Sequence, residues 1–169
     1  MSKAFTREDD IAAEPILRPQ LSSLPAGAKN YLTQDGARRL QEELNRLTED
    51  ERPRVASLPE AEEAKAQLPI LDQRIAQLDQ SLRSAEIVSP PDPPHEVVRF
   101  GATVTVRNRA REILRYRIVG VDETDMDRNW VSWRSPIATA LINAQLGERV
   151  RFRFPAGEEE LEIVRIFYE

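Results

Sequence analysis

The chain has 169 residues, a net charge of −5, 31% charged residues and no cysteine. Without cysteine the protein cannot form disulfides, use thiol catalysis or bind a metal through cysteine. Its single histidine, His95, argues against a metal site built on several imidazoles and against a Ser-His-Asp triad. The acidic balance argues against a protein that mainly coats nucleic acid. No apolar run approaches the ~18 residues of a membrane span, and the acidic N-terminus is unlike a signal peptide, so we expect a cytoplasmic protein without membrane contact.

Residues 1–30 show no apolar periodicity. Prolines, serines and balanced charge alternate there, which is typical of an extended or flexible arm. A short docking contact through Ile16, Leu17 or Leu21 is an alternative for part of this arm.

Residues 31–88 carry a helical periodicity. Apolar side chains recur at spacings of three and four in two runs, which places each run on one side of a helix. The first run is Ala37, Leu40, Leu44 and Leu47, and the second is Ala61, Ala64, Leu68, Leu71, Ile75, Leu78, Leu82 and Ala85. Because each stripe needs a partner, we predict an antiparallel helical hairpin, or coiled coil. Two chains could also satisfy this seam, so the sequence leaves the oligomeric state open.

Prolines decide where the hairpin turns. Pro53 predicts a kink or an early end of the first helix, because an interior proline removes one hydrogen bond and clashes with the preceding turn. Pro59 suits the first turn of the second helix, so we place the hairpin turn near residues 57–60. Pro69 leaves a turn at residues 67–69 as an alternative, but the heptad repeat favours the earlier position.

The pattern changes after a proline-rich linker at residues 89–97. Apolar and polar residues then alternate as in half-buried strands over residues 98–106, 113–119, 130–133, 149–154 and 161–168. Ser135 and Pro136 begin a short helix that continues to Leu146, and Gly147 closes it. The predicted fold class is therefore α+β, with a helical hairpin followed by a globular domain, residues 98–169, of about five antiparallel strands and one short helix.

Several blocks of the sequence occur in the order found in one known family. They are Tyr31–Thr33 with Gly36, Leu40, Glu43 and Leu44, then Arg52–Pro53, Glu86–Val88, Phe100–Val106, Tyr116–Glu123, Ser135–Ile142 and Pro155–Glu158. In these blocks the chain closely resembles the bacterial Gre transcript-cleavage factors, and the likeness covers roughly residues 31–169.

The resemblance implies a fold and a partner. It implies an N-terminal coiled coil and a C-terminal domain of the FKBP-like type, without isomerase activity. In the family, the globular domain docks at the rim of the RNA polymerase secondary channel and the coiled coil enters the channel. Two acidic residues in a Gly-Asp-x-x-Glu-Asn-Ala tip segment then help the polymerase hold a second Mg²⁺ that hydrolyses backtracked RNA.

The hairpin departs from that family pattern. Nothing between Pro53 and Glu86 matches the acidic tip segment, and the hairpin is shorter than usual by about a dozen residues, or ~9 Å of reach if the loss is shared between two arms. Glu60, Glu62 and Glu63 lie near the predicted turn and could substitute for the acidic pair, but glutamates at a helix start are ordinary features. No catalytic residue is therefore assigned beyond these three carboxylates.

The family's polymerase-docking residues have counterparts in this sequence, whereas its acidic tip residues do not. Ser135 and Pro136 match a family segment implicated in gripping the polymerase, and with Arg134 and Ile137 they form the predicted polymerase contact. Arg134 stands where the family usually has Asn or Asp, and a reversed charge at an interface can cost several kcal/mol.

A basic face is also possible on one hairpin of the globular domain. Its arginines are Arg99, Arg107, Arg109, Arg111, Arg115 and Arg117. Either an acidic surface of the polymerase or RNA would suit such a face.

We therefore predict an RNA polymerase secondary-channel factor that modulates elongation by occupying the channel, with weak or no stimulation of RNA cleavage. One alternative is a working cleavage factor whose turn glutamates help to hold Mg²⁺. Another is an FKBP-like interaction module with a dimerising hairpin. We expect no metal site, no intrinsic cofactor and no sequence-specific nucleic-acid binding. Mg²⁺ shared with the polymerase is the alternative to having no cofactor.

Overall fold

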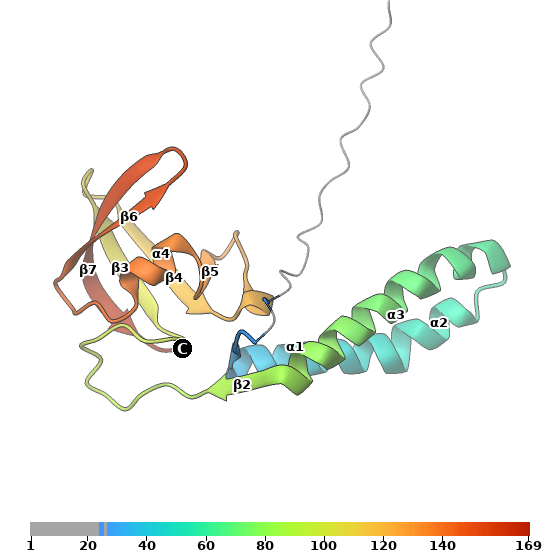
Figure 1. Ribbon diagram of the computed structural model, residues 1–169. Coiled ribbons are helices and arrows are strands. Elements are labelled where there is room, and N and C mark those ends of the chain that lie inside the picture. Colours follow the sequence, from blue (N-terminus) through green and yellow to red (C-terminus); the bar gives the residue numbers. More distant parts are fainter. Residues whose placement is uncertain (1–23, 26) are drawn as a thin grey trace, which may run out of the picture.

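The computed structural model describes residues 24, 25 and 27–169. It shows a helical hairpin that projects from a globular domain built on a curled sheet (Figure 1). Most of the predicted arm, including Ile16, Leu17 and Leu21, lies outside the described residues. Asn30, the last residue assigned to that arm, is the first residue of strand β1 (Asn30–Thr33).

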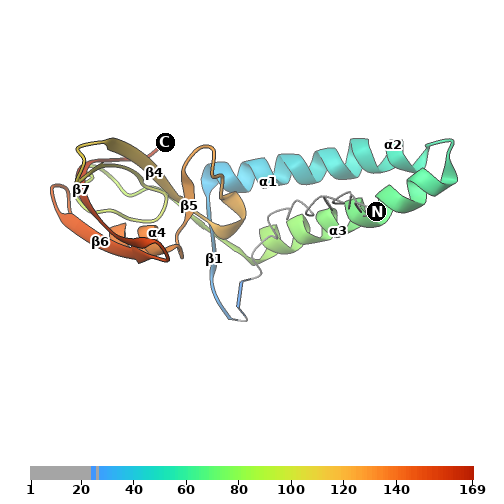
Figure 2. The same ribbon diagram turned by 90° about the horizontal axis from the view of Figure 1, so that it is seen from above.

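The hairpin consists of two antiparallel arms of similar length (Figure 2). Its first arm comprises α1 (Gln34–Arg46), a π-helical turn (Leu47–Glu51) and α2 (Arg52–Ala56). The second arm is α3 (Ala61–Ser84), about 36 Å long at 1.5 Å per residue. Residues 57–60 connect the two arms.

Pro53 does not end the first arm, so of the kink or early end expected there, the early end is wrong. The backbone N–H of Arg52 donates to Leu47 O, five residues back, which is the bond of a π-helical turn. This wider turn accommodates the proline ring, which in a regular helix would clash with the carbonyl four residues earlier. The helix therefore continues through Pro53 to Ala56.

Apolar side chains hold the two arms together. Leu40, Leu47 and Leu78 are buried in one cluster with Leu32 of β1, and the partly buried side chains of Leu44, Leu71, Ile75, Leu82 and Ala85 pack against it. This seam lies within one chain. Ala61, expected in the seam, is exposed, so the buried stripe of α3 begins at Ala64.

A two-stranded parallel sheet closes the base of the hairpin. Strand β1 enters the hairpin and pairs with β2 (Ala85–Val88), which leaves it, from Asn30↔Ala85 to Thr33↔Val88. The sequence analysis did not predict this sheet, because each strand has only four residues and lies directly against a helix. Asn30 Nδ2 also donates to Ser81 O at 3.0 Å, which joins β1 to the end of α3.

The globular domain contains five strands in the order β5-β4-β3-β7-β6. They are β3 (Thr103–Asn108), β4 (Ile113–Val119), β5 (Trp130–Ser132), β6 (Arg149–Phe154) and β7 (Gly157–Phe167). Five strands were predicted, but the sheet is mixed and not wholly antiparallel, since β5 runs parallel to β4. A 3₁₀ turn at Val121–Glu123 and the loop after it return the chain along β4. Strand β5 therefore begins beside Arg117 of β4 and runs in the same direction as β4.

The short helix α4 (Pro136–Leu141) lies against the sheet and buries Ile137, Ala138 and Leu141. It ends earlier than predicted. Asn143 N donates to Val98 O and Val98 N donates to Ala144 O, both at 2.9 Å, so the following residues pair with the end of the linker and leave the helix. Gly147 is therefore not the helix cap. It lies in the turn before β6, with a positive φ of 85°.

In the part of the chain that the structure describes, no helix combines the length and the apolar character of a membrane span.

Candidate functional site

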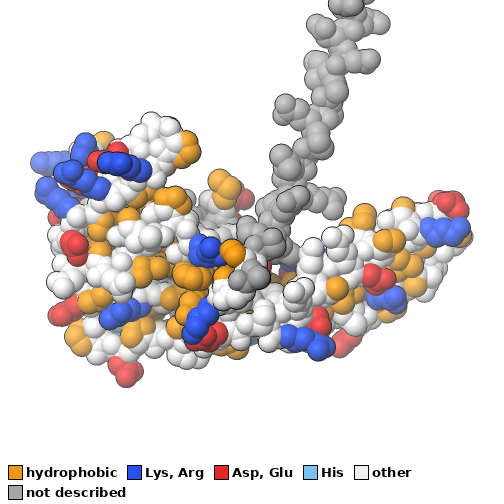
Figure 3. All heavy atoms as spheres, in the orientation of Figure 1, with side chains coloured by type: hydrophobic (Ala, Val, Ile, Leu, Met, Phe, Trp, Pro, Cys, Tyr) orange, Lys and Arg blue, Asp and Glu red, His pale blue; other side chains and the backbone are white. Residues whose placement is uncertain are grey.

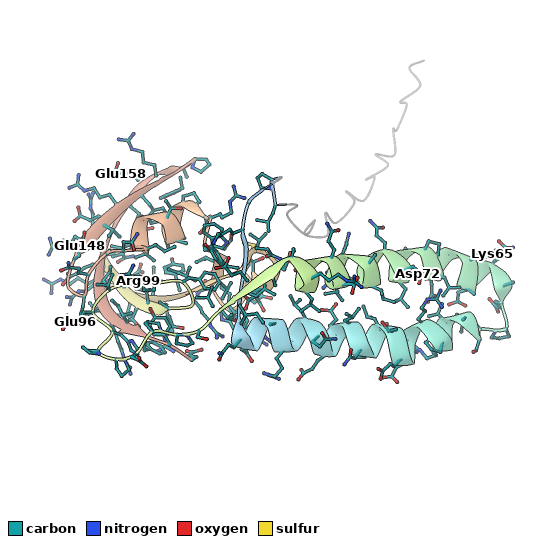
Figure 4. The ribbon with its side chains drawn as sticks, turned by 60° about the horizontal axis from the view of Figure 1, so that its bottom comes forward. Lys65, Asp72, Glu96, Arg99, Glu148 and Glu158 are labelled. Atoms are coloured by element: carbon teal, nitrogen blue, oxygen red, sulfur yellow. The ribbon has the colours of Figure 1, made fainter. Side chains whose placement is uncertain are left out.

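The tip of the hairpin is the first candidate site. α2 ends at Ala56, and Glu60, in an extended conformation, precedes the first residue of α3. Glu62 and Glu63 follow in the first helical turn, where negative charge favours the helix dipole. All three glutamates are exposed. Figure 4 shows Lys65 at this end of the hairpin and Asp72 further along α3.

The tip carboxylates do not converge on a common point. Glu62 Oε1 lies 3.1 Å from Lys65 Nζ in an ion pair, and Glu63 Oε1 accepts a hydrogen bond of 2.9 Å from Gln67 Nε2. Among the residues that the structure describes, no three His, Cys, Asp or Glu side chains could hold a metal ion together.

Two ion pairs between the arms stiffen the hairpin below its tip. Arg52 Nε lies 2.6 Å from Asp72 Oδ1, and this partnership raises the pKa of Arg52. Arg74 donates to both carboxylate oxygens of Glu43, at 2.9 and 3.0 Å. Bidentate arginine–carboxylate contacts of this kind add geometric definition, so the arms are held in register by polar contacts as well as by the leucine seam.

A buried carboxylate joins the hairpin to the globular domain. Glu123 Oε2 accepts from the backbone N–H groups of Thr33 and Gly120, each at 2.9 Å, and Glu123 Oε1 accepts from the Thr33 hydroxyl. Thr33 Oγ1 in turn accepts from Gly36 N at 2.9 Å and caps α1. The Glu123 side chain is 1% exposed, and Arg39 Nη2 lies 3.7 Å from it.

The fit around Glu123 requires glycine at position 36. A Cβ atom there would lie 1.8 Å from Glu123 Oε1, which is far below any tolerable contact. Next to Glu123 in the sequence, Asp122 accepts a hydrogen bond from the Ser81 hydroxyl, which connects α3 to the 3₁₀ turn. The blocks of family resemblance contain both Gly36 and Glu123, but the sequence alone did not reveal their roles. The available signals were a glycine inside a helical pattern and an acid three residues after Gly120.

The predicted polymerase-contact residues lie together at the start of α4. The Ser135 hydroxyl accepts from Ala138 N at 3.2 Å and caps the helix, and Pro136 is its first residue. Arg134 is exposed, with its guanidinium 6.0 Å from the Trp133 ring. Ile137 is only 9% exposed and belongs to the core, so its side chain supports this segment from below.

The rings of both tryptophans pack against other side chains of the protein. The guanidinium groups of Arg39, Arg117 and Arg128 lie 4.4, 4.8 and 5.1 Å from the Trp130 ring. The Trp133 ring packs edge-on against Tyr31 at 5.1 Å. These aromatic rings therefore join the globular domain to the base of the hairpin.

Comparisons with known proteins agree with these features. Residues 93–168 match the family described as transcription elongation factor, GreA/GreB, C-terminal. The chain is 37% identical to transcription elongation factor GreB of Pasteurella multocida in an alignment of 153 residues that covers 83% of this chain and 97% of the relative. It is 36% identical to transcription elongation factor GreA of Halorhodospira halophila in an alignment of 158 residues that covers 84% of this chain and 99% of the relative.

A similar solved structure is that of GreA factor homolog 1 of Thermus thermophilus, which is 25% identical, with a TM-score of 0.40, covering 83% of this chain and 99% of that one. In the alignment with GreB, 83% of this chain is about 140 residues, so about a dozen of the 153 aligned positions have no counterpart here.

Proposed function

This chain belongs to the GreA/GreB family of transcription elongation factors, and from that premise we propose how it acts. It binds RNA polymerase at the rim of the secondary channel and modulates elongation by occupying the channel with its hairpin. It stimulates RNA cleavage weakly or not at all. In this proposal residues 31–88 form the channel-entering part, residues 98–169 form an FKBP-like docking domain, and the factor acts in the cytoplasm.

The observation that carries the proposal is the chemistry of the tip. A factor that helps to hold a catalytic cation must offer carboxylate oxygens that are free to point at it. Here Glu62 is ion-paired with Lys65, and Glu63 is bonded to Gln67.

The docking surface supports binding without cleavage. Arg134 is exposed beside the capped start of α4, and Ser135 and Pro136 fix the backbone of that segment. The leucine seam is buried within a single chain, with Leu78 1% exposed. The hairpin therefore does not need a second copy to cover its apolar face, which favours a channel-entering hairpin over a dimerising one.

A competition assay tests the proposal. Backtracked RNA polymerase complexes are incubated with an authentic GreB, and cleavage of the transcript is followed while this protein is added. We expect little cleavage from this protein alone and a concentration-dependent loss of the cleavage that GreB stimulates. Arg134→Asp should strengthen the competition, because Asp is one of the residues that the family usually has at this docking position, and a reversed charge there can cost several kcal/mol.

A triple variant distinguishes occupation of the channel from stimulation of RNA cleavage by the tip glutamates. Glu60→Ala, Glu62→Ala and Glu63→Ala together should leave the competition with GreB unchanged, with Glu42→Ala on the exposed side of α1 as the control. Strong cleavage by the wild-type protein that disappears in the triple variant would show instead that the turn glutamates serve the metal. Failure to compete, together with no recovery of polymerase subunits in a pull-down, would favour an interaction module for another partner.

A further inference from the structure

A cluster of arginines covers one face of the sheet at the end remote from the hairpin, where blue side chains gather in Figure 3. We call it the arginine ladder, and it consists of Arg107, Arg109, Arg111, Arg149, Arg151 and Arg153 with Glu158, Glu160 and Glu162 of β7. Figure 4 shows Glu158 at this end of the molecule, opposite Lys65 at the hairpin tip. Most of these residues line a groove of about 420 Å³.

The register of three strands builds the ladder. Glu162 of β7 is paired with Arg107 of β3 on one side and with Arg149 of β6 on the other. Its carboxylate lies 3.0 Å from Arg107 Nη2 and 3.7 Å from Arg149 Nη2. A row of glutamates therefore runs between two rows of arginines.

Glu160, two residues before Glu162 on β7, is likewise shared by two arginines. Glu160 Oε2 lies 2.9 Å from Arg151 Nε and 3.6 Å from Arg109 Nη2. The hydrogen bond from Arg151 holds the pKa of Glu160 below its usual value, so this carboxylate is ionised at neutral pH. Since two arginines share each of these carboxylates, the ladder keeps a net positive charge.

The arginine side chains of β6 are more exposed to solvent than the glutamate side chains that they pair with. The side chains of Arg149, Arg151 and Arg153 are 68%, 64% and 89% exposed, whereas that of Glu160 is 19% exposed. A fourth carboxylate, Glu112, lies in the turn after β3 and accepts from Asn108 Nδ2. Even with it, six arginines face four acids, and an approaching anion meets guanidinium groups before it meets carboxylates.

The spacing indicates what kind of anion would bind. Arg149, Arg151 and Arg153 alternate along the edge strand β6, so the Cα atoms of successive arginines are about 7 Å apart and their side chains leave the same face. This interval is comparable to the distance between successive phosphates of an extended single strand. Planar guanidinium groups bind phosphate oxygens in pairs.

We propose that the arginine ladder is a binding site for the phosphate backbone of single-stranded RNA, aligned along β6. Binding there needs neither the hairpin tip nor RNA polymerase. It is therefore measured with the protein alone, and its failure would leave the proposed action on the polymerase untouched.

The test is fluorescence anisotropy of a labelled oligouridylate titrated with the full chain at several salt concentrations. Replacing Arg149, Arg151 and Arg153 by Ala should weaken binding by about tenfold or more and should reduce the slope of log affinity against log salt by about 2, since each phosphate contact on a single strand contributes about 0.7. Arg83→Ala, an equally exposed arginine on α3, is the control and should change neither quantity.

A second variant distinguishes a binding site from a purely structural ion-pair network. Glu160→Gln removes the carboxylate that competes for Arg109 and Arg151, so it should tighten RNA binding by a few fold. Equal RNA affinity in the wild-type protein and the triple arginine variant, or weaker binding by Glu160→Gln with an unchanged melting temperature, would overturn the proposal. Loss of polymerase affinity in the triple variant with unchanged RNA binding would show that the ladder meets an acidic protein surface.

Discussion

Glu123 is the residue on which the joint between hairpin and globular domain depends. A buried carboxylate is costly unless its charge is met by donors. Here the backbone N–H groups of Thr33 and Gly120, the Thr33 hydroxyl and the nearby Arg39 supply them. The carboxylate also lies at the start of α1, where the helix dipole favours a negative charge. One side chain of the globular domain thereby fixes the start of the hairpin.

Gly36→Ala should destabilise the fold by about 1–3 kcal/mol, because the new methyl group overlaps Glu123. The same change in a Glu123→Ala background should instead stabilise by about 0.5–1 kcal/mol, since alanine favours a helix over glycine. Urea unfolding of the four proteins in this cycle measures both effects. Additive costs in the double variant would contradict the assigned contact.

Asp35 makes the stability of the hairpin depend on acid pH. A hydrogen bond from Arg38 first, and then the charges of Arg39 and Arg38, hold the pKa of Asp35 below its ordinary 3.8. A carboxylate with a lowered pKa stabilises the folded state above its unfolded pKa, and this contribution is lost as the pH falls through the folded pKa.

Asp35→Asn should therefore cost about 0.5 kcal/mol at pH 7. The difference from the wild-type protein should shrink once the pH falls below 3.8 and should vanish below the folded pKa. Chemical unfolding of both proteins across this range measures the difference. A difference that stays constant with pH would show that the charge of Asp35 is not responsible.

At the scale of elements, the hairpin is held by a narrow seam between two otherwise solvated helices. Leu78 is 1% exposed at its centre, whereas Ile70 on the same helix is 58% exposed. The hydrophobic contribution therefore comes from one side of α3, and the ion pair of Arg74 with Glu43 flanks it.

Leu78→Ala should cost about 2–5 kcal/mol, because it removes buried methyl groups and leaves a cavity between the arms. Ile70→Ala, the matched control on the exposed side of α3, should cost under about 0.5 kcal/mol. Helix content followed by circular dichroism during thermal unfolding measures both. Similar costs for the two changes would mean that the arms do not pack as described.

At the scale of the whole molecule, the two parts should unfold as one unit. The Glu123 contacts, the Asp122–Ser81 hydrogen bond and the packing of Tyr31 on Trp133 and Phe100 all cross the junction between them. Both tryptophans lie in the globular domain, while most of the helix lies in the hairpin. Tryptophan fluorescence and far-ultraviolet circular dichroism therefore report on different parts.

In the wild-type protein the two signals should give one coincident thermal transition. Glu123→Ala leaves two buried backbone N–H groups without an acceptor and should cost about 2–3 kcal/mol. It should also separate the transitions, with the hairpin melting first. Coincident transitions in the variant would show that the aromatic contacts alone couple the two parts.

Elements with a local or periodic signal could be predicted from the amino-acid sequence alone. The spacing of Leu40, Leu71 and Leu78 predicted the helix pair, alternation predicted the five strands, and Ser135 with Pro136 predicted the start of α4. Family membership also followed from the sequence, because it rests on ordered blocks of residues. The three tip glutamates and the contact residues at α4 stay predictions, which the polymerase assays test.

Features that depend on residues far apart in the chain became visible only in the folded molecule. The parallel pairing of β1 with β2, the parallel placement of β5 and the early end of α4 each arise from a partner that is distant in sequence. The buried position of Glu123 and the arginine ladder have the same origin, since no local pattern shows that a carboxylate will meet a helix start 90 residues away. Local spacing determines which elements form, whereas packing determines which side chains meet.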